Sequence, residues 1–213
     1  AIAGSSNSLL HLPAIAHELG IEQSPALFDK IHRKIPYLLN IRPSGYWPGE
    51  YFWYAGGVPA IMEEIKDFLH LNILTVTGKT VGENLENMRL RGFYEGCRKH
   101  LSGLGVKVHD IIRPASEPIR REGAIAILKG NLAPEGAVVK HSAISPKLLK
   151  VSLKARVFNC EEDAMKAVID KQIHPGDAVF IRYEGPKGSG MPEMFYTTEA
   201  IASDASLIDS VAL

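Results

Sequence analysis

The spacing of apolar residues changes near the middle of the chain, and this change constrains the fold more than any other feature. In the first half, apolar residues recur every three or four positions, most clearly between residues 59 and 69, which is typical of helices that pack on a core. From about Glu117 onward, short apolar runs are separated by turns that contain Gly, Pro and Asn, which predicts strands. The sequence therefore predicts an α/β fold with a helix-rich part followed by a mixed β/α part.

The first half is expected to contain three clear helices. The first begins after a cap at Ser5 or Ser6 and ends at Gly20, because Ser is a favoured N-cap and Gly a favoured helix stop. The second covers residues 25–34 and the third residues 59–69.

The second half is expected to contain short strands and two helices. Asn159 is the expected N-cap of the first of these helices, with Glu162 at the capping-box position. The expected strands cover residues 124–128, 137–140, 155–158 and 178–183, and the second helix covers residues 191–202.

A polar, proline-broken stretch at residues 113–122 indicates a domain boundary. We therefore predict one domain over residues 1–115 and a second over residues 116–213. The chain begins without Met and ends on the apolar residues 211–213, which resemble the start of a strand. Since termini are usually polar, we expect a segment of a longer protein.

Composition excludes several classes of protein. Lys and Arg total 24 and Asp and Glu total 24, so the chain lacks the basic excess that nucleic-acid binding requires. No apolar run approaches the ~20 residues of a membrane-spanning helix, and the first residues do not read as a signal peptide. The two cysteines exclude a disulfide framework. We expect a cytoplasmic protein that contacts neither nucleic acid nor membrane.

The segment from Ile181 to Met194 carries the strongest candidate site. A predicted strand ends at Glu184, with Arg182 on the same face, and three glycines follow within a few residues. A carboxylate beside such a turn suits a hard cation such as Mg²⁺. The alternative is an ordinary surface turn in which Glu184 pairs with Lys187 or Arg182, and spacing alone favours this alternative.

The remaining motifs are weaker. Asn7 and His11 stand four residues apart on the first helix and could face a substrate, although a cap residue and a half-buried histidine are the commoner interpretation. Residues 76–80 lack the glycine of a nucleotide-binding loop, because Ile73 occupies its position. The carboxylates of residues 63–64 are expected on the solvated side of their helix.

Several segments, taken in order, resemble the dihydroxyacid dehydratase / phosphogluconate dehydratase family. The resemblance runs nearly from end to end, which makes it more specific than any single motif. The segments that carry it are residues 4–12, 55–58, 74–84, 123–140 and 182–188. The loop at residues 42–45 and the aromatic run at residues 52–57 are more similar to the aldonate dehydratases of this family.

The resemblance implies a longer protein with an iron–sulfur cluster and Mg²⁺. The cluster would be held by three cysteines outside this chain, so neither Cys97 nor Cys160 is assigned to it. Glu184 matches the family's Mg²⁺-ligating glutamate in a Tyr-Glu-Gly-Pro motif, and this match favours the metal-site interpretation. The catalytic serine would follow Leu213, so no catalytic residue is expected here. Candidate substrate-binding residues are Asn7, His11, Gly185, Lys187 and Gly188.

The implied function is that of a hydro-lyase that dehydrates a 2,3-dihydroxy acid, here a sugar acid, to a 2-oxo acid. The alternatives are a dihydroxyacid dehydratase of branched-chain amino acid synthesis and a non-catalytic binding module that retains the fold. The resemblance implies incomplete domains, the second similar to a swivelling β-barrel, in a homodimer or homotetramer. Its only other expected partner is the hydroxy-acid substrate, and this chain alone is expected to be inactive.

Overall fold

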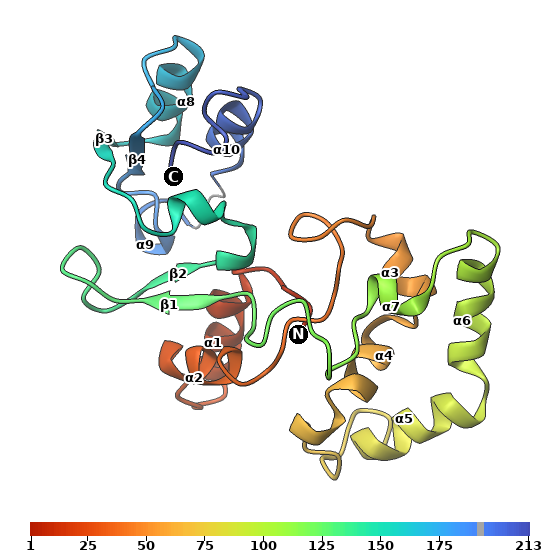
Figure 1. The fold of residues 1–213 in the computed structure, drawn as a ribbon. Coiled ribbons are helices and arrows are strands. Elements are labelled where there is room, and N and C mark those ends of the chain that lie inside the picture. The colour runs from red at the N-terminus through yellow and green to blue at the C-terminus, as the bar shows by residue number, and fades with distance from the viewer. Residues whose placement is uncertain (191–193) are drawn as a thin grey trace. The chain divides into compact units, whose positions relative to one another are not determined.

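The computed structural model describes residues 1–190 and 194–213, which form two compact units (Figure 1). Unit 1 is Ala1–Ala143 and unit 2 is Ile144–Leu213. The mixture of helices and strands confirms the α/β prediction. The described strands form two separate two-stranded sheets and no closed barrel, and no described helix is long and apolar enough to span a membrane.

Unit 1 is mostly helical and carries one hairpin. Its strands β1 (Ala126–Leu128) and β2 (Ala137–Val139) are antiparallel, as predicted, with Ala126 opposite Val139. Its helices are α1 (Ser8–Glu18), α2 (Pro25–His32), α3 (Glu50–Tyr54), α4 (Gly57–Glu64), α5 (Val81–Leu90), α6 (Phe93–Ser102) and α7 (Val108–Ile111), with 3-10 turns η1 (Lys66–Phe68) and η2 (His141–Ala143).

The core of unit 1 surrounds an extended segment that the helical periodicity did not predict. Tyr37, Leu38 and Leu39 are at most 1% exposed, and Leu101 and Ile111 are among the side chains that pack on them. The carbonyl groups of Tyr37 and Leu38 accept hydrogen bonds from later parts of the chain. The buried backbone of this segment is therefore satisfied without a regular sheet.

Two helix predictions for unit 1 need correction. The N-cap of α1 is Asn7 rather than Ser5 or Ser6, and the Ser5 hydroxyl instead accepts a hydrogen bond from the Asn7 amide at 3.2 Å. The helix predicted over residues 59–69 ends at Glu64 and continues as η1. The beginning of that stretch packs in the core, where Ile61 is 3% exposed, but its end does not, since Phe68 is 49% exposed.

The β1–β2 hairpin is fastened to α2 by side chains rather than by another strand. The Ile125 amide donates to His32 Nδ1, and the Ile127 amide donates to Asp29 Oδ1, both at 3.3 Å. The Gly123 amide donates to the His32 carbonyl. A Cβ at Gly123 would lie 2.8 Å from His32 Nδ1, so only glycine fits there. Because of these contacts, the hairpin and the residues up to Ala143 belong to unit 1. The predicted domain boundary at residues 115/116 refers to the domains of a longer chain, and it stays a prediction.

Unit 2 is a small α/β unit. Strands β3 (Lys154–Phe158) and β4 (Asp177–Ile181) are parallel, with Lys154 opposite Asp177, and Ala212 adds a single parallel bridge to β4. Apolar residues of the strands and of the two longer helices form its core. The helices are α8 (Glu161–Ile169), α9 (Pro186–Ser189) and α10 (Phe195–Ala202), and η3 (Pro146–Leu148) is a 3-10 turn.

Several predictions for unit 2 also need correction. The capping box with Asn159 is wrong, because the N-cap of α8 is Cys160, whose side chain makes no cap hydrogen bond. Strand β4 stops at Ile181 rather than Tyr183, since Tyr183 has φ of 68° and cannot continue a strand. The last predicted helix begins at Phe195 in the described part, and residues 191–193 lie outside the described residues.

Candidate functional site

Glu184 follows β4 and is held by two hydrogen bonds within unit 2. Its side chain is half-buried. The Glu161 amide donates to Oε1 at 3.3 Å, and the Ser189 hydroxyl donates to Oε2 at 2.8 Å. The first amides of α8 have no partner within the helix, and the Cys160 side chain does not cap them. The hydrogen bond from the Glu161 amide to Glu184 satisfies one of these amides. Glu184 is therefore fixed in orientation at the N-terminus of α8, where the helix dipole favours negative charge.

The alternative surface ion pair for Glu184 is not formed among the described residues. Arg182 donates from Nε and Nη2 to the Asn159 side-chain oxygen, at 3.0 and 2.7 Å, and its guanidinium lies 5.1 Å from the centre of the Tyr183 ring. Lys187 is exposed and forms no described salt bridge. The strand alternation that placed Arg182 and Glu184 on one face fails because the strand ends before both residues.

The glycine-rich segment after Glu184 is a short helix rather than an open loop. The amides of Gly188 and Ser189 both donate to the Gly185 carbonyl at 3.0 Å. A Cβ at Gly188 would overlap the Tyr183 carbonyl oxygen, whereas nothing lies within 4 Å of a Cβ at Gly185. The close turn brings Ser189 back to the Glu184 carboxylate. Gly185, Lys187 and Gly188 thus lie beside Glu184, and their substrate-binding role stays a prediction.

Asn7 and His11 lie at the beginning of α1, in unit 1. The Asn7 carbonyl accepts a hydrogen bond from the His11 amide at 3.0 Å, so the two residues stand one turn apart as the spacing predicted. Asn7 is half-buried and His11 is exposed. They belong to a different compact unit from Glu184, and their substrate-binding role also stays a prediction.

Glu161 and Ser189 are contacts of the candidate site that sequence analysis missed. Glu161 accepts a hydrogen bond through Oε1 from the Thr197 amide at 3.1 Å. Its side chain therefore caps the beginning of α10, while its own amide donates to Glu184. The acidic first turn of α8 was a visible signal, because acidic residues favour helix N-termini. Which helix each carboxylate reaches depends on tertiary packing.

The described residues do not fit an iron–sulfur cluster. Three cysteines are required, but this chain has Cys97 in unit 1 and Cys160 in unit 2. Cys97 is buried, and burial raises the pKa of its thiol, which disfavours the thiolate that binds iron.

The described residues also do not form a complete magnesium site. No three His, Cys, Asp or Glu side chains among them gather closely enough to hold a metal ion. An ionised carboxylate has about four acceptor positions, so the two hydrogen bonds on Glu184 leave room for one metal contact. Glu184 therefore has acceptor capacity left for a metal ion, and its role as a Mg²⁺ ligand stays a prediction.

Comparison with known proteins connects both ends of the chain to one group of enzymes. Residues 1–84 match the model of the dihydroxy-acid/6-phosphogluconate dehydratase N-terminal region, and residues 110–213 match that of the C-terminal region. The chain is 45% identical to dihydroxy-acid dehydratase 1 of Methanosarcina acetivorans over 215 residues. It is 44% identical to the dihydroxy-acid dehydratase of Caldicellulosiruptor saccharolyticus over 216 residues. Each alignment covers 100% of this chain and 36% of the relative, so the chain spans about a third of its relatives' length.

Proposed function

Because the chain belongs to the dihydroxy-acid/6-phosphogluconate dehydratase family, we propose that it forms part of a hydro-lyase that converts a 2,3-dihydroxy acid to a 2-oxo acid. The continuity of the similarity supports this proposal. The two family models match in order along the chain, and the relatives align with all of it. The activity would belong to a protein of the relatives' length.

The substrate favoured by the comparisons is a dihydroxy acid of branched-chain amino acid synthesis. The relatives reported above are named dihydroxy-acid dehydratases. The sugar acid expected from the loop at residues 42–45 and the aromatic run at residues 52–57 is less well supported, since those short segments carry less information than the whole alignment.

In this reaction the C2 proton and the C3 hydroxyl group leave, and the resulting enol rearranges to the 2-oxo acid. We assign Glu184 one ligand position on Mg²⁺. Bound Mg²⁺ supplies Lewis-acid stabilisation of charge on the substrate carboxylate. The Ser189 hydroxyl and the Glu161 amide hold the Glu184 carboxylate in one orientation, which lowers the entropy lost when it binds the ion. The catalytic serine, the cluster cysteines and the homodimeric or homotetrameric assembly remain expectations for the longer protein.

The substrate proposal is tested by assaying the full-length protein for 2-oxo acid formation. The substrates are 2,3-dihydroxy-3-methylbutanoate and a panel of aldonates. We expect kcat/KM to be highest for the branched dihydroxy acid. A preference for an aldonate would restore the sugar-acid interpretation, and no turnover of any substrate would contradict the proposed activity.

The role of Glu184 is tested by Glu184→Gln in the same protein, which preserves size but removes the charge. We expect weaker Mg²⁺ binding, measured by titration calorimetry, and turnover reduced by roughly a hundredfold or more at limiting Mg²⁺. Glu199→Gln is the matched control, because Glu199 is an exposed carboxylate on α10 of the same unit. Unchanged Mg²⁺ affinity and near-normal turnover in Glu184→Gln would exclude the ligand role.

A further inference from the structure

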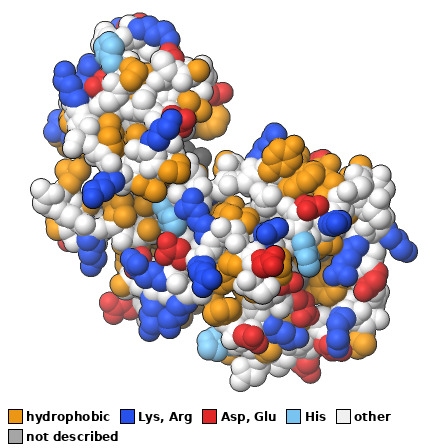
Figure 2. Space-filling view, viewed as in Figure 1, with side chains coloured by type: hydrophobic (Ala, Val, Ile, Leu, Met, Phe, Trp, Pro, Cys, Tyr) orange, Lys and Arg blue, Asp and Glu red, His pale blue; other side chains and the backbone are white. Residues whose placement is uncertain are grey.

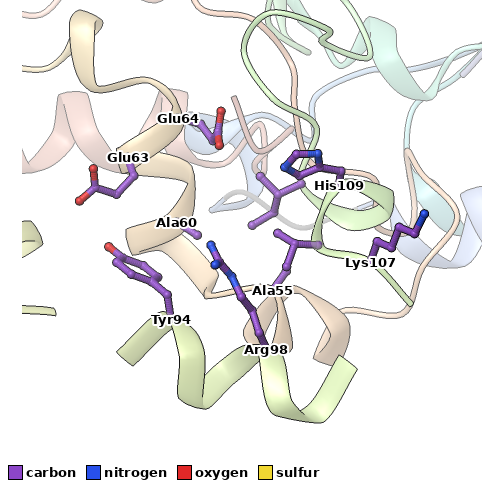
Figure 3. Close-up of a pocket in the computed structure, with 10 residues that line it drawn as sticks. Ala55, Ala60, Glu63, Glu64, Tyr94, Arg98, Lys107 and His109 are labelled. Carbon is purple, nitrogen blue, oxygen red and sulfur yellow. The ribbon is translucent and has the colours of Figure 1, made fainter. Parts of the chain in front are cut away.

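Unit 1 contains a cavity that is lined by none of the candidate site residues. Its volume is about 400 Å³, enough for a small organic molecule. Side chains from α4, α6 and α7 line it, and Figure 3 shows Glu64, Arg98 and His109 pointing toward the same space from these three helices. The sequence had placed Glu63 and Glu64 on a solvated helix face, but both are half-buried in the cavity wall.

The cavity lining carries charges of both signs, with the exposed side chains of Arg98 and Lys107 and the half-buried carboxylates of Glu63 and Glu64. Arg98 forms no hydrogen bond or ion pair with any residue that the structure describes. Glu64 accepts one hydrogen bond, from the Ala115 amide to Oε2 at 3.2 Å, and Oε1 has no partner in the described part of the chain. Glu63, by contrast, pairs with Lys66 at 3.3 Å. Figure 3 shows the Lys107 side chain directed away from Glu64 and Arg98, so Arg98 and Glu64 are the charges assigned to a ligand.

Part of the remaining wall is apolar. Ala55 and Ile112 are each 2% exposed, and with Ala60 they give the cavity an apolar lining. Such a wall suits a ligand with a short apolar part.

We propose that this cavity binds a small zwitterion, an α-amino acid with a short apolar side chain. Its carboxylate would pair with the Arg98 guanidinium, whose planar donors suit a carboxylate, and its ammonium group would bind the free oxygen of Glu64. A simple anion would be repelled by Glu64 and a simple cation by Arg98. A ligand that carries both charges can instead pair with both side chains. The proposed dihydroxy-acid substrate lacks the ammonium group, so a zwitterion would be a different ligand from that substrate.

The test is titration calorimetry on the full-length protein with three molecules of similar size. These are L-2-aminobutyrate, butyrate, which lacks the ammonium group, and propylamine, which lacks the carboxylate. We expect binding of L-2-aminobutyrate that is at least roughly tenfold tighter than that of either analogue, since a hydrogen bond to a charged group contributes this much. Equal binding of butyrate or propylamine, or no binding of L-2-aminobutyrate at millimolar concentration, would overturn the proposal.

Variants then locate the binding site. Arg98→Gln and Glu64→Gln should each weaken binding of L-2-aminobutyrate by roughly tenfold to a hundredfold. Glu64→Gln retains an oxygen for the Ala115 amide, so it removes the charge without removing that hydrogen bond. Arg89→Gln is the control, because Arg89 lies on α5 and pairs with Glu86 outside the cavity. Thermal unfolding verifies that each variant is folded, and unchanged affinity in folded Arg98→Gln and Glu64→Gln would refute the assignment.

Discussion

The two compact units differ in the polar groups that join their elements: unit 1 uses imidazoles beside the Asp29 carboxylate, whereas the contacts described for unit 2 use carboxylates. In unit 1, imidazoles fasten the hairpin: His32 Nδ1 accepts the Ile125 amide at 3.3 Å, and His141 Nε2 lies 2.7 Å from the Gly123 carbonyl. A carbonyl can only accept, so His141 Nε2 carries the proton, and its other nitrogen faces Arg120 at 3.2 Å. The Nδ1 atom of His32 accepts only while it carries no proton, so its contact with the hairpin requires a neutral His32.

In unit 2, carboxylates accept the hydrogen bonds that join the elements. Glu184 accepts the first amide of α8, and Glu161 accepts the Thr197 amide of α10. A carboxylate has several acceptor positions, whereas an imidazole nitrogen accepts only when it carries no proton. The comparison teaches that the hairpin of unit 1 depends on a histidine whose pKa is lowered by burial, so that acid should loosen the hairpin.

The largest effect is expected from Gly188→Ala in unit 2. The new Cβ would overlap the Tyr183 carbonyl oxygen, so the turn that brings Ser189 to Glu184 must open. We expect a loss of about 1–3 kcal/mol, typical of a side chain forced into filled space, measured by amide hydrogen exchange in β4 and α9. Gly185→Ala is the control and should change stability by less than about 0.5 kcal/mol, because its Cβ meets open space. Similar losses for both variants would show that the Gly188 contact does not hold the turn.

The next effect concerns the hairpin of unit 1 and its pH dependence. Burial lowers the pKa of His32 from 6.5, and the charges of the amino terminus and His141 lower it further, while Asp29 opposes them. Because the folded pKa lies below the unfolded value, stability is complete above pH 6.5 and falls as the pH drops through the folded pKa. We expect exchange of the Ile125 amide to accelerate over this range.

His32→Ala should remove most of this pH dependence. It should also cost about 1–2 kcal/mol at neutral pH, because the Ile125 amide loses its acceptor. His70→Ala, an exposed histidine of the same unit, is the control and should leave the pH profile unchanged. If the profile of His32→Ala matched that of the unaltered protein, another group would be responsible and the comparison would fail.

The smallest effect is expected from Glu161→Ala. The variant leaves the Thr197 amide without its acceptor, and loss of a helix cap typically costs about 1 kcal/mol. Hydrogen exchange of the α10 amides measures this loss, with Glu199→Ala as the control on the same helix. Should α10 exchange at an unchanged rate in Glu161→Ala, the carboxylate would not stabilise that helix.

Local signals in the sequence predicted the elements well where the structure depends on neighbours in the chain. The second helix begins at Pro25 after a Ser24 side chain that accepts the Ala26 amide, and the predicted hairpin is present. Predictions failed where a side chain had a choice of partners. Asn159 could cap α8, but Arg182, 23 residues later, takes its oxygen instead. A capping motif gives no information about such a distant competitor.

The sequence by itself determined the family, because the matching segments follow one another along the whole chain. It also determined the described strands and several of the helices, because periodicity and turn residues act over a few positions, whereas α3, α5, α6, α7 and α9 were not predicted. Tertiary structure alone decided where the carboxylates lie. It directed Glu184 to α8 and Glu161 to α10, and it placed Glu64 in a cavity wall. The physical reason is that each of these groups is satisfied by atoms far away in sequence, and only the packing of helices against strands brings such atoms within hydrogen-bonding distance.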